Sequence, residues 1–421
     1  MNILWITNIL FPEVSAKLTG QRDLKATGGW LLGAAKMLEQ IEDLSLSVAA
    51  VSPLVRKLEV VKGEKITYYV LPYGKGNHTY NKDYEPLWKE INTIAKPDVV
   101  HLHGTEYTHG LAYIKACGSD NVVVSIQGMK SVYYYYYYYG LTKWSIYSHI
   151  TFRDIIKGSI VKGQNDFKKQ GEYEKEIIRS VKHIIGRTSW DRANTWAINP
   201  EVKYHFCNET LRSEFYDGSR WSYDSCRKYT IFLSQAGYPI KGLHQVLKAL
   251  PIVLQHYPDT QVRIAGNDIT NEKGLRNRLR FTGYGSIIKS LIKKYHIKEH
   301  ITFTGSLNAE EMKQEYLNCN VFVCPSSIEN SPNSLGEAQI LGTPVIASYV
   351  GGIPDMMKGD EEHLYRFEEV NMLAEKICRV FANEDNQVDL TEIAFIRHHQ
   401  EINRKRLCSI YKFIIGENTI K

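Results

Sequence analysis

The sequence lacks the features that mark several large classes of protein. None of its 421 residues lies in an apolar run of 18 or more, so no transmembrane helix is predicted. The first residues, MNILWITNILF, lack the basic start and the small-residue cleavage site of a secretory signal. They are typical of a buried first strand instead, and we expect a cytoplasmic protein, either free or peripheral on the inner membrane face.

Closely spaced cysteines and a strong excess of one charge are also absent. The seven cysteines form no CxxC pair and no metal-ligand spacing, which favours reduced thiols and predicts no metal site. The net charge of +6 is mild, so it permits an anionic ligand or an acidic membrane surface without requiring either. No basic nucleic-acid module is visible, and nucleic acid is not an expected partner.

Short apolar runs alternate with amphipathic stretches along both halves of the chain. In the first half, NILWIT, LSLSVAAVS, DVVHLHG and VVVSIQG are typical of strands, and GGWLLGAAKMLEQI is typical of a helix. After a polar, broken stretch the pattern restarts with YTIFLSQAG, QVRIAG, ITFTGSL, NVFVCPS and PVIASY. This alternation predicts two doubly wound domains with parallel sheets, in which ligands lie beyond the carboxyl ends of the strands.

The composition of the segments sets the predicted domain boundaries. Residues 1–206 form an N-terminal Rossmann-like domain, residues 207–228 a linker and residues 229–398 a C-terminal Rossmann-like domain. The basic, periodic residues 399–421 are predicted to form a helix that packs back toward the N-terminal domain. With two such domains, the ligand site is expected in the cleft between them.

Residues 326–348, SSIENSPNSLGEAQILGTPVIAS, place two glutamates around a short polar loop. Ser334 begins a Ser-x-x-Glu pattern with Glu337 in fourth place, which predicts a capping box at the start of a short helix. The helix follows a strand, so the N–H groups on about Asn333 to Gly336 form a candidate anion site.

A helix N-terminus attracts a phosphate by only about 0.3–1 kcal/mol when it is exposed, so a full cation should assist it. Lys241, which also follows a strand and precedes a helix, is the candidate. Carboxylates repel phosphate but accept hydrogen bonds from sugar hydroxyls. Glu329 and Glu337 therefore suit the transferred sugar and the ribose, the alternative being that Glu337 is only a cap and Glu329 a solvated acid.

These motifs resemble the signature of retaining glycosyltransferases of the GT-B fold, family four (glycosyl transferases group 1). The resemblance includes two glutamates eight positions apart, followed by GTPVIAS and GGIPD. It extends to SQAGYPIKG, VRIAGN, ITFTGSL and the early GGWLLGAAKML, and it is most specific over residues 230–356. These motifs occur in the family's order, which makes the match stronger than any single motif.

The resemblance implies a role for each matching position. Glu329 lies beside the donor sugar, Glu337 binds the ribose hydroxyls, and Lys241 neutralises the diphosphate. The resemblance also implies that the amides of Asn333, Ser334 and Leu335 bind the diphosphate. The backbone of Gly28 and Gly29 would approach the phosphates, the alternative being that these two glycines form an ordinary turn before a helix. The sequence has no Asp-x-Asp pattern, so Lys241 and the helix end are expected to replace a metal ion, and no cofactor is expected.

The sequence departs from the family's pattern at two positions. Gln235 stands where the family usually has an arginine, and Arg187 could supply that charge, unless it forms a structural salt bridge. Gln127, expected on the acceptor side, stands where the family often has a histidine that aids the reacting sugar, and an amide cannot shuttle protons. His103 is a candidate for the lost role or a structural residue, and Glu106 is an acceptor contact or a loop acid.

Seven consecutive tyrosines, Tyr133 to Tyr139, match neither helical nor strand periodicity. Together with Trp144 and several lysines they give residues 130–170 an aromatic and basic character. Three interpretations remain open: contact with a membrane surface or a lipid-linked glycan, stacking on sugar faces, or a packed aromatic helix.

The resemblance implies a metal-independent hexosyltransferase with a nucleotide-diphosphate donor, UDP being favoured on family grounds. The acceptor would be a glycan or a lipid-linked glycan in cell-surface polysaccharide synthesis, and the anomeric configuration would be retained. Two alternatives stay open: a nucleotide-sugar epimerase on the same fold, and an inactive protein that binds a sugar nucleotide or docks on a membrane.

Overall fold

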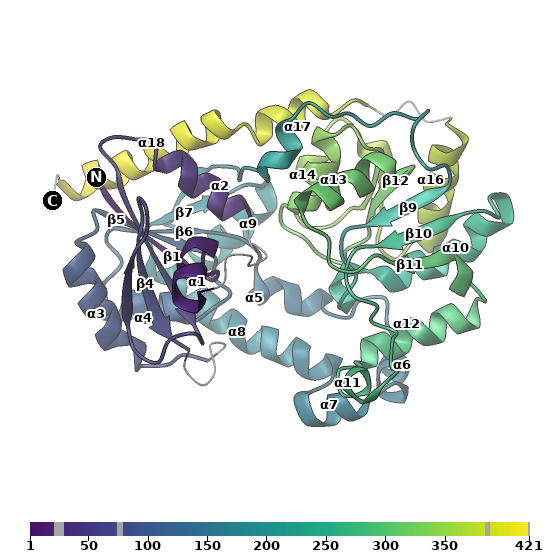
Figure 1. The fold of residues 1–421 in the computed structure, drawn as a ribbon, viewed down its shortest axis with the longest axis horizontal. Helices are drawn as coiled ribbons and strands as arrows, with labels where there is room; N and C mark the ends of the chain where they lie inside the picture. Colours follow the sequence, from purple (N-terminus) through teal and green to yellow (C-terminus); the bar gives the residue numbers. More distant parts are fainter. Residues whose placement is uncertain (21–28, 74–78, 384–387, 420–421) are drawn as a thin grey trace. The chain divides into compact units, whose positions relative to one another are not determined.

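A computed structural model describes residues 1–20, 29–73, 79–383 and 388–419 (Figure 1). The chain divides into two compact units, each made of segments that are distant in sequence. The first unit contains Met1–Val132, Phe167–Arg212 and Ile396–Lys421, and the second contains Tyr133–Asp166 and Ser213–Phe395. Residues 133–166, which the sequence-based boundaries assign to the N-terminal domain, therefore group with the second unit.

The first unit is built on a sheet whose described strands follow the order β3-β4-β2-β1-β5-β6-β7-β8. All neighbours are parallel except β3 and β4, which form an antiparallel pair that the sequence analysis did not predict. The strands are β1 (Asn2–Thr7), β2 (Ser45–Ser52), β3 (Glu59–Lys62), β4 (Thr67–Pro72), β5 (Val99–His103), β6 (Val122–Ser125), β7 (His183–Gly186) and β8 (Lys203–Phe206).

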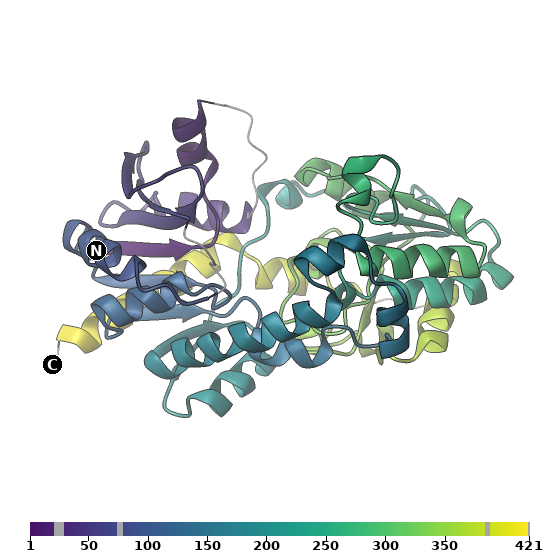
Figure 2. The same cartoon turned by 90° about the horizontal axis from the view of Figure 1, so that it is seen from below.

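Helices cover both faces of this sheet. The buried residues of α2 and α18 pack on one face, and those of α3, α4 and α8 pack on the other. The helix α18, coloured yellow, lies along the sheet of the first unit in both views (Figures 1 and 2). The helices are α1 (Pro12–Thr19), α2 (Gly29–Leu38), α3 (Tyr84–Ala95), α4 (His109–Cys117), α5 (Lys130–Tyr133), α8 (Ile160–Ser180), α9 (Ser189–Ile198) and α18 (Gln400–Thr419).

The second unit has an all-parallel sheet with the described strand order β11-β10-β9-β12-β13-β14. Its central strands are buried along their whole length, as expected for strands covered on both faces. The strands are β9 (Thr230–Leu233), β10 (Gln261–Ile264), β11 (Ile301–Phe303), β12 (Val321–Cys324), β13 (Val345–Ser348) and β14 (Leu364–Tyr365).

Two apolar layers stabilise the second unit. The main core joins α10, α12 and α16 to one face of the sheet and includes Ile146 and Ile160. On the other face, Tyr316 makes edge-on ring contacts with Phe232 and Phe322, at centroid distances of 5.2 Å and 5.1 Å. The helical elements are η1 (Tyr134–Tyr136), α6 (Lys143–Ser148), α7 (Phe152–Lys157), η2 (Ser213–Tyr216), η3 (Pro239–Lys241), α10 (Leu243–His256), α11 (Leu275–Arg278), α12 (Gly283–Lys294), η4 (Lys298–His300), α13 (Ala309–Asn318), α14 (Asn333–Ile340), α15 (Ile353–Met356), η5 (Glu361–His363), α16 (Val370–Ala382) and α17 (Thr391–Arg397).

The predicted pair of parallel α/β domains is confirmed, and so is the C-terminal helix, observed as α18. All seven cysteines are free, as predicted. None of the helices in the described ranges is long and apolar enough to cross a bilayer.

The tyrosine run is partly packed against the second unit and partly exposed. Tyr137 and Tyr138 pack against the main core of that unit. The backbone oxygens of Tyr134 and Tyr136 accept hydrogen bonds from Gln164 and Ser327, both at 2.9 Å. These contacts favour the packed interpretation for Tyr137 and Tyr138, whereas Tyr135, Tyr136 and Tyr139 are exposed.

Candidate functional site

Lys241 and Glu329 meet at one edge of the second sheet. Lys241 closes η3 after β9, and Glu329 lies on the loop after β12. Because β9 and β12 are adjacent and parallel, their carboxyl ends lie at the same edge. Lys241 Nζ donates to Glu329 Oε1 at 2.5 Å, and Ser326 Oγ donates to the same oxygen at 2.9 Å.

The pairing fixes the charge state of the lysine. Burial by itself would lower the pKa of Lys241, but the carboxylate of Glu329 outweighs that effect and raises the pKa above its usual value. Lys241 is therefore a permanent cation at neutral pH, held at the carboxyl edge of the sheet. A cation of this kind is the group that a diphosphate requires.

Glycines allow the loop of Glu329 to close against the neighbouring segment. Gly351 has a φ of +54°, and a Cβ there would lie 1.8 Å from the backbone oxygen of Glu329. The amide of Gly352 donates to that same oxygen at 3.0 Å. The GGIPD motif therefore has a structural reason, because it lets the backbone approach and orient the Glu329 loop.

The predicted capping box at Ser334 is wrong. The helix α14 begins at Asn333 and its N-cap is Pro332, two residues before the predicted cap, and no side chain caps it. Proline fixes an extended backbone here, and its carbonyl accepts the amides of Leu335 at 3.0 Å and Gly336 at 3.4 Å. Ser334 thus lies inside the first turn, and the Leu335 amide, a predicted phosphate donor, already has a partner within the helix.

Glu337 lies buried on α14, the helix that follows the Glu329 loop. The hydroxyl of Tyr316 donates to Glu337 Oε2 at 3.4 Å. Leu335 on the same helix is fully buried. The second unit therefore brings together Lys241, Glu329, Ser326 and the first turn of α14, while Gln235 is exposed on the loop after β9.

Ser326 is a member of this site that the sequence analysis missed. Its hydrogen bond to Glu329 leaves that carboxylate with a fixed orientation. The only available signal is its position three residues before Glu329 at the end of a buried strand, and serine at such a position is too common to be diagnostic.

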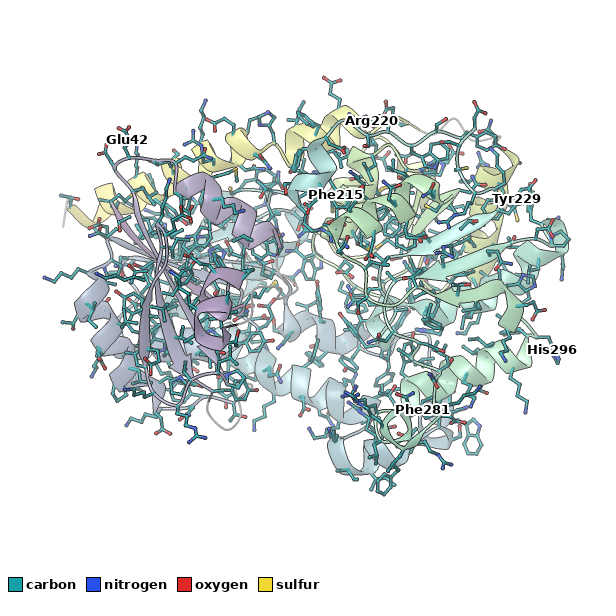
Figure 3. All side chains as sticks on the ribbon, in the orientation of Figure 1. Glu42, Phe215, Arg220, Tyr229, Phe281 and His296 are labelled. Atoms are coloured by element: carbon teal, nitrogen blue, oxygen red, sulfur yellow. The ribbon has the colours of Figure 1, made fainter. Side chains whose placement is uncertain are left out.

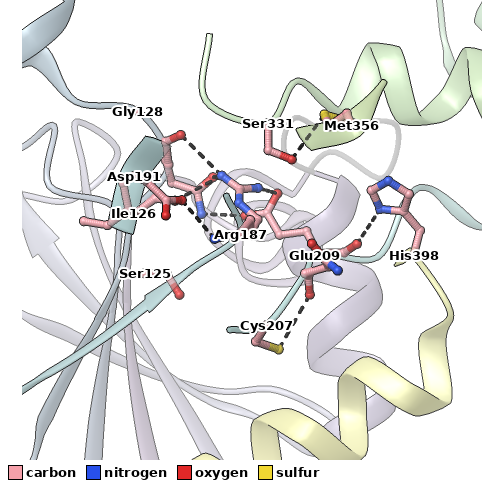
Figure 4. Close-up of polar contacts among 12 residues, drawn as sticks. Ser125, Ile126, Gly128, Arg187, Asp191, Cys207, Glu209, Ser331, Met356 and His398 are labelled. Atoms are coloured by element: carbon pink, nitrogen blue, oxygen red, sulfur yellow. Dashed lines mark hydrogen bonds and ion pairs between the residues drawn. The ribbon is translucent and has the colours of Figure 1, made fainter. Parts of the chain in front are cut away.

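Arg187 forms the structural salt bridge that the sequence left open as an alternative. It lies after β7 in the first unit, and its Nη1 is 2.5 Å from Glu209 Oε2 (Figure 4). Its Nη2 also donates to the backbone oxygen of Ile126 at 3.0 Å. Gln127 Nε2 donates to the other oxygen of Glu209, at 2.6 Å. Arg187 and Gln127 are thus joined through one partly buried carboxylate.

Removing that carboxylate is expected to destabilise the first unit. Glu209→Ala would leave the buried guanidinium of Arg187 without its counter-ion, at a cost of about 3 kcal/mol. Urea titration should show a lower unfolding midpoint, whereas the exposed control Glu201→Ala should unfold like the wild type. An unchanged midpoint for Glu209→Ala would mean that the pair contributes nothing to stability.

His103 ends β5 in the core of the first unit. Its ring lies 4.4 Å from that of Trp5 and stacks on His101 at 3.8 Å. Burial, and secondarily His101, holds its pKa well below the usual range. Neither ring nitrogen has a hydrogen-bond partner within the described residues. These surroundings favour the structural interpretation of His103 over a proton shuttle.

The buried side chain of His101 should make the stability of the fold sensitive to acid. Its ring nitrogens contact Tyr411 Oη and Ser125 Oγ, both at 2.6 Å, and burial lowers its pKa to about 3. An unfolded histidine titrates near pH 6.5, so the unfolded state binds the extra proton below that pH. The free energy of unfolding should therefore decrease as the pH is lowered from about 6.5 to 3. For this residue the decrease is roughly 1.4 kcal/mol per pH unit.

The measurement is urea unfolding across that pH window. His101→Gln should flatten the pH slope relative to the wild type, while His256→Gln, at an exposed position, should leave it unchanged. Equal slopes for the wild type and His101→Gln would mean that His101 does not cause the pH dependence of stability.

The other predicted residues of the first unit lie near a buried charged cluster. Glu106 Oε1 accepts the amide of Gly128 at 3.2 Å, and burial raises the pKa of this carboxyl. Lys130 Nζ donates to the backbone oxygen of Glu106 at 2.7 Å, and its amide donates to the fully buried Glu174 at 3.2 Å. The sequence did not predict Lys130 or Glu174, because isolated charges in a helical pattern usually lie on a solvated face.

The glycine pair is described only in part. Gly28 lies outside the described residues. Gly29 is the first residue of α2. A Cβ at this position would lie 3.0 Å from the Cγ of Arg212, so a larger residue would require the Arg212 side chain to move. No group of three or more metal-ligating side chains is found in the ranges that the structure describes.

Comparison with known proteins finds glycosyltransferases. Residues 221–397 match the model of glycosyl transferases group 1. A putative glycosyltransferase, YtcC of Bacillus subtilis, is 27% identical over 42% of this chain and 43% of its own length. The gpi3 subunit of phosphatidylinositol N-acetylglucosaminyltransferase of Schizosaccharomyces pombe is 22% identical over 80% of this chain and 65% of its own length. The chain thus spans less than half of the first of these relatives.

Solved structures establish the fold. Sucrose-phosphate synthase from Thermosynechococcus elongatus aligns with a TM-score of 0.63 at 16% identity, covering 99% of this chain and 97% of that one. The Anabaena protein HepE in complex with UDP aligns at 0.62 with 14% identity, covering 98% and 100%. The fold is therefore GT-B, and residues 221–397 match the model of glycosyl transferases group 1. Both expectations from the sequence motifs are confirmed.

Proposed function

We propose that this protein is a retaining glycosyltransferase that transfers a sugar from a UDP-sugar to a glycan or a lipid-linked glycan. Polysaccharide synthesis at the cytoplasmic face of the membrane is the setting in which we expect it to act. One observation carries the proposal: Lys241 and Glu329 are paired at the carboxyl edge of the second sheet, where α14 begins. The glycosyltransferase family of this region supports it.

The proposed chemistry depends on leaving-group stabilisation. Cleavage of the anomeric C–O bond places negative charge on the departing diphosphate and positive charge on the sugar ring. Lys241 would neutralise the diphosphate together with the first turn of α14, where Asn333 and Ser334 lie. These groups would neutralise the diphosphate in place of a metal ion, so we propose a metal-independent enzyme without a resident cofactor.

The acids would contact the sugars. Glu329 is held by Lys241 and Ser326, so its orientation is fixed before the donor arrives. Its charge would favour the positive ring of the transition state, while Glu337 on α14 would accept from the ribose hydroxyls. We propose that Gln127 and Glu106 lie on the acceptor side. Arg187 is engaged with Glu209, which supports a structural role for it instead of a donor contact.

The experiment is incubation with UDP-, GDP- and ADP-sugars, with and without glycan acceptors. Acceptor-dependent release of UDP, with an anomeric configuration that nuclear magnetic resonance shows to be retained, supports the proposal. A changed sugar without nucleotide release would indicate an epimerase. An intact donor despite a raised melting temperature would indicate a protein that binds nucleotide sugars without turnover.

A further inference from the structure

The second unit carries an exposed apolar surface on the helices α6 and α7. We call it the α6–α7 surface, and it consists of Trp144, Tyr147, Ile150, Phe152, Ile155 and Ile156. Trp144 is 81% exposed and Ile155 76% exposed, so these side chains are almost fully in water. Scattered single exposures need no explanation, but six in a stretch of 13 residues form a patch.

The two helices that carry this surface are well anchored. Ile146 of α6 is buried in the main core of the second unit. Thr142 accepts the amide of Ser145 to cap α6, and Thr151 forms a capping box with the buried Asp154 at the start of α7. The hydroxyl of Thr151 also donates to the backbone oxygen of Phe281 at 2.8 Å. The apolar side chains are therefore presented by a fixed platform.

The same end of the second unit is basic. Figure 1 shows α11 beside α7, and Figure 3 labels Phe281, which joins this segment to Thr151. On and around α11, Leu275 is 76% exposed and Leu279 is also exposed. The exposed cations of the two segments are Lys143, Lys157, Lys273, Arg276, Arg278 and Arg280. The acids beside them are engaged, because Glu272 pairs with Lys289 at 2.5 Å and Asp154 is buried in its capping box.

We propose that the α6–α7 surface, with the basic segment 273–280, docks this protein on an anionic lipid bilayer. Tryptophan, phenylalanine and isoleucine side chains enter the boundary between headgroups and acyl chains, and flanking lysines and arginines bind the negative headgroups. This combination fits a bilayer better than an acidic protein, because large exposed apolar side chains beside exposed cations match the acyl and headgroup layers of a membrane interface. The surface follows the tyrosine run in sequence, whose Tyr137 and Tyr138 are packed inside.

The first test is flotation with vesicles of phosphatidylcholine, with or without about one third phosphatidylglycerol. The wild type should float with the anionic vesicles. A triple variant, Trp144→Ser, Phe152→Ser and Ile155→Ser, should bind at least tenfold more weakly. The matched control replaces three exposed apolar residues elsewhere, Val60→Ser, Met372→Ser and Ile393→Ser, and should bind like the wild type. A wild type that stays unbound, or a triple variant that binds equally well, overturns the proposal.

A second test separates a specific basic surface from net charge. Arg276→Gln, Arg278→Gln and Arg280→Gln together should weaken binding about tenfold and reduce its salt dependence. Lys293→Gln, Lys294→Gln and Lys298→Gln remove the same charge from exposed positions of the same unit and should change binding less than twofold. Equal losses of vesicle affinity in the two triple variants would show that net charge alone attracts the protein to the vesicles. That result would overturn the proposed docking surface.

A third measurement uses a substitution that keeps the surface apolar, so that a folding defect cannot explain the result. Vesicles with brominated acyl chains should quench the tryptophan fluorescence of the wild type. Trp144→Phe should lose most of that quenching while it keeps its vesicle affinity. Undiminished quenching in Trp144→Phe would mean that Trp144 does not enter the bilayer, and the proposal would fail.

Discussion

Lys241→Ala is expected to lower the turnover of a UDP-sugar by a factor of about 100 to 1,000. This corresponds to the roughly 2.7–4 kcal/mol that one preorganised donor contributes at a developing charge. The affinity for UDP should fall as well, because the cation acts on the diphosphate both before and after transfer. Steady-state kinetics and calorimetric titration with UDP measure the two effects.

Two further variants make this result specific. Lys241→Arg keeps the charge and should retain more turnover than Lys241→Ala, although guanidinium geometry differs from that of an ammonium. Lys298→Ala removes an exposed lysine of the same unit and should behave like the wild type. Circular dichroism should show intact secondary structure in each variant. Wild-type turnover in a folded Lys241→Ala protein would refute the assignment of Lys241.

Glu329→Gln should give a different signature from Lys241→Ala. The amide keeps the shape of the side chain and can still accept the hydrogen bond from Ser326. It removes the charge beside the sugar, so turnover is expected to fall about 100-fold. Affinity for UDP should rise by as much as roughly tenfold, about 1.4 kcal/mol, because Lys241 is no longer shared with a carboxylate.

Parallel loss of turnover and UDP affinity in Glu329→Gln would contradict this separation of roles. It would mean that Glu329 serves to position Lys241 and does not contact the sugar. Unchanged turnover would remove Glu329 from the reaction altogether. Ser326→Ala provides a check on orientation, and it should lower turnover less than Glu329→Gln does.

The placement of Lys241 and Glu329 at one edge of a sheet follows from sequence patterns. Two short apolar runs that end in polar residues predict parallel strands, and neighbouring parallel strands end at one edge. The predicted strands TIFL and VFVC are observed as the adjacent strands β9 and β12. The structure adds the adjacency of these strands and the ion pair itself, in which Lys241 Nζ lies 2.5 Å from Glu329 Oε1.

Other features depend on contacts that no local pattern reports. The partner of Arg187 is Glu209, which lies in a polar segment that the sequence suggests is only a linker. The tyrosine run has no period, so its buried and exposed members cannot be separated before the core of the second unit is known. At α14, the Ser-x-x-Glu pattern is present, but the helix already begins at Asn333 with Pro332 as its N-cap, so Ser334 lies inside the first turn and cannot cap it.

The most direct test of the central claim is a crystal structure with UDP bound. The account predicts diphosphate oxygens within about 3 Å of Lys241 Nζ, beside the first turn of α14, with the Lys241–Glu329 pair loosened or broken. Diphosphate density at any other place, with that pair still intact, would contradict it.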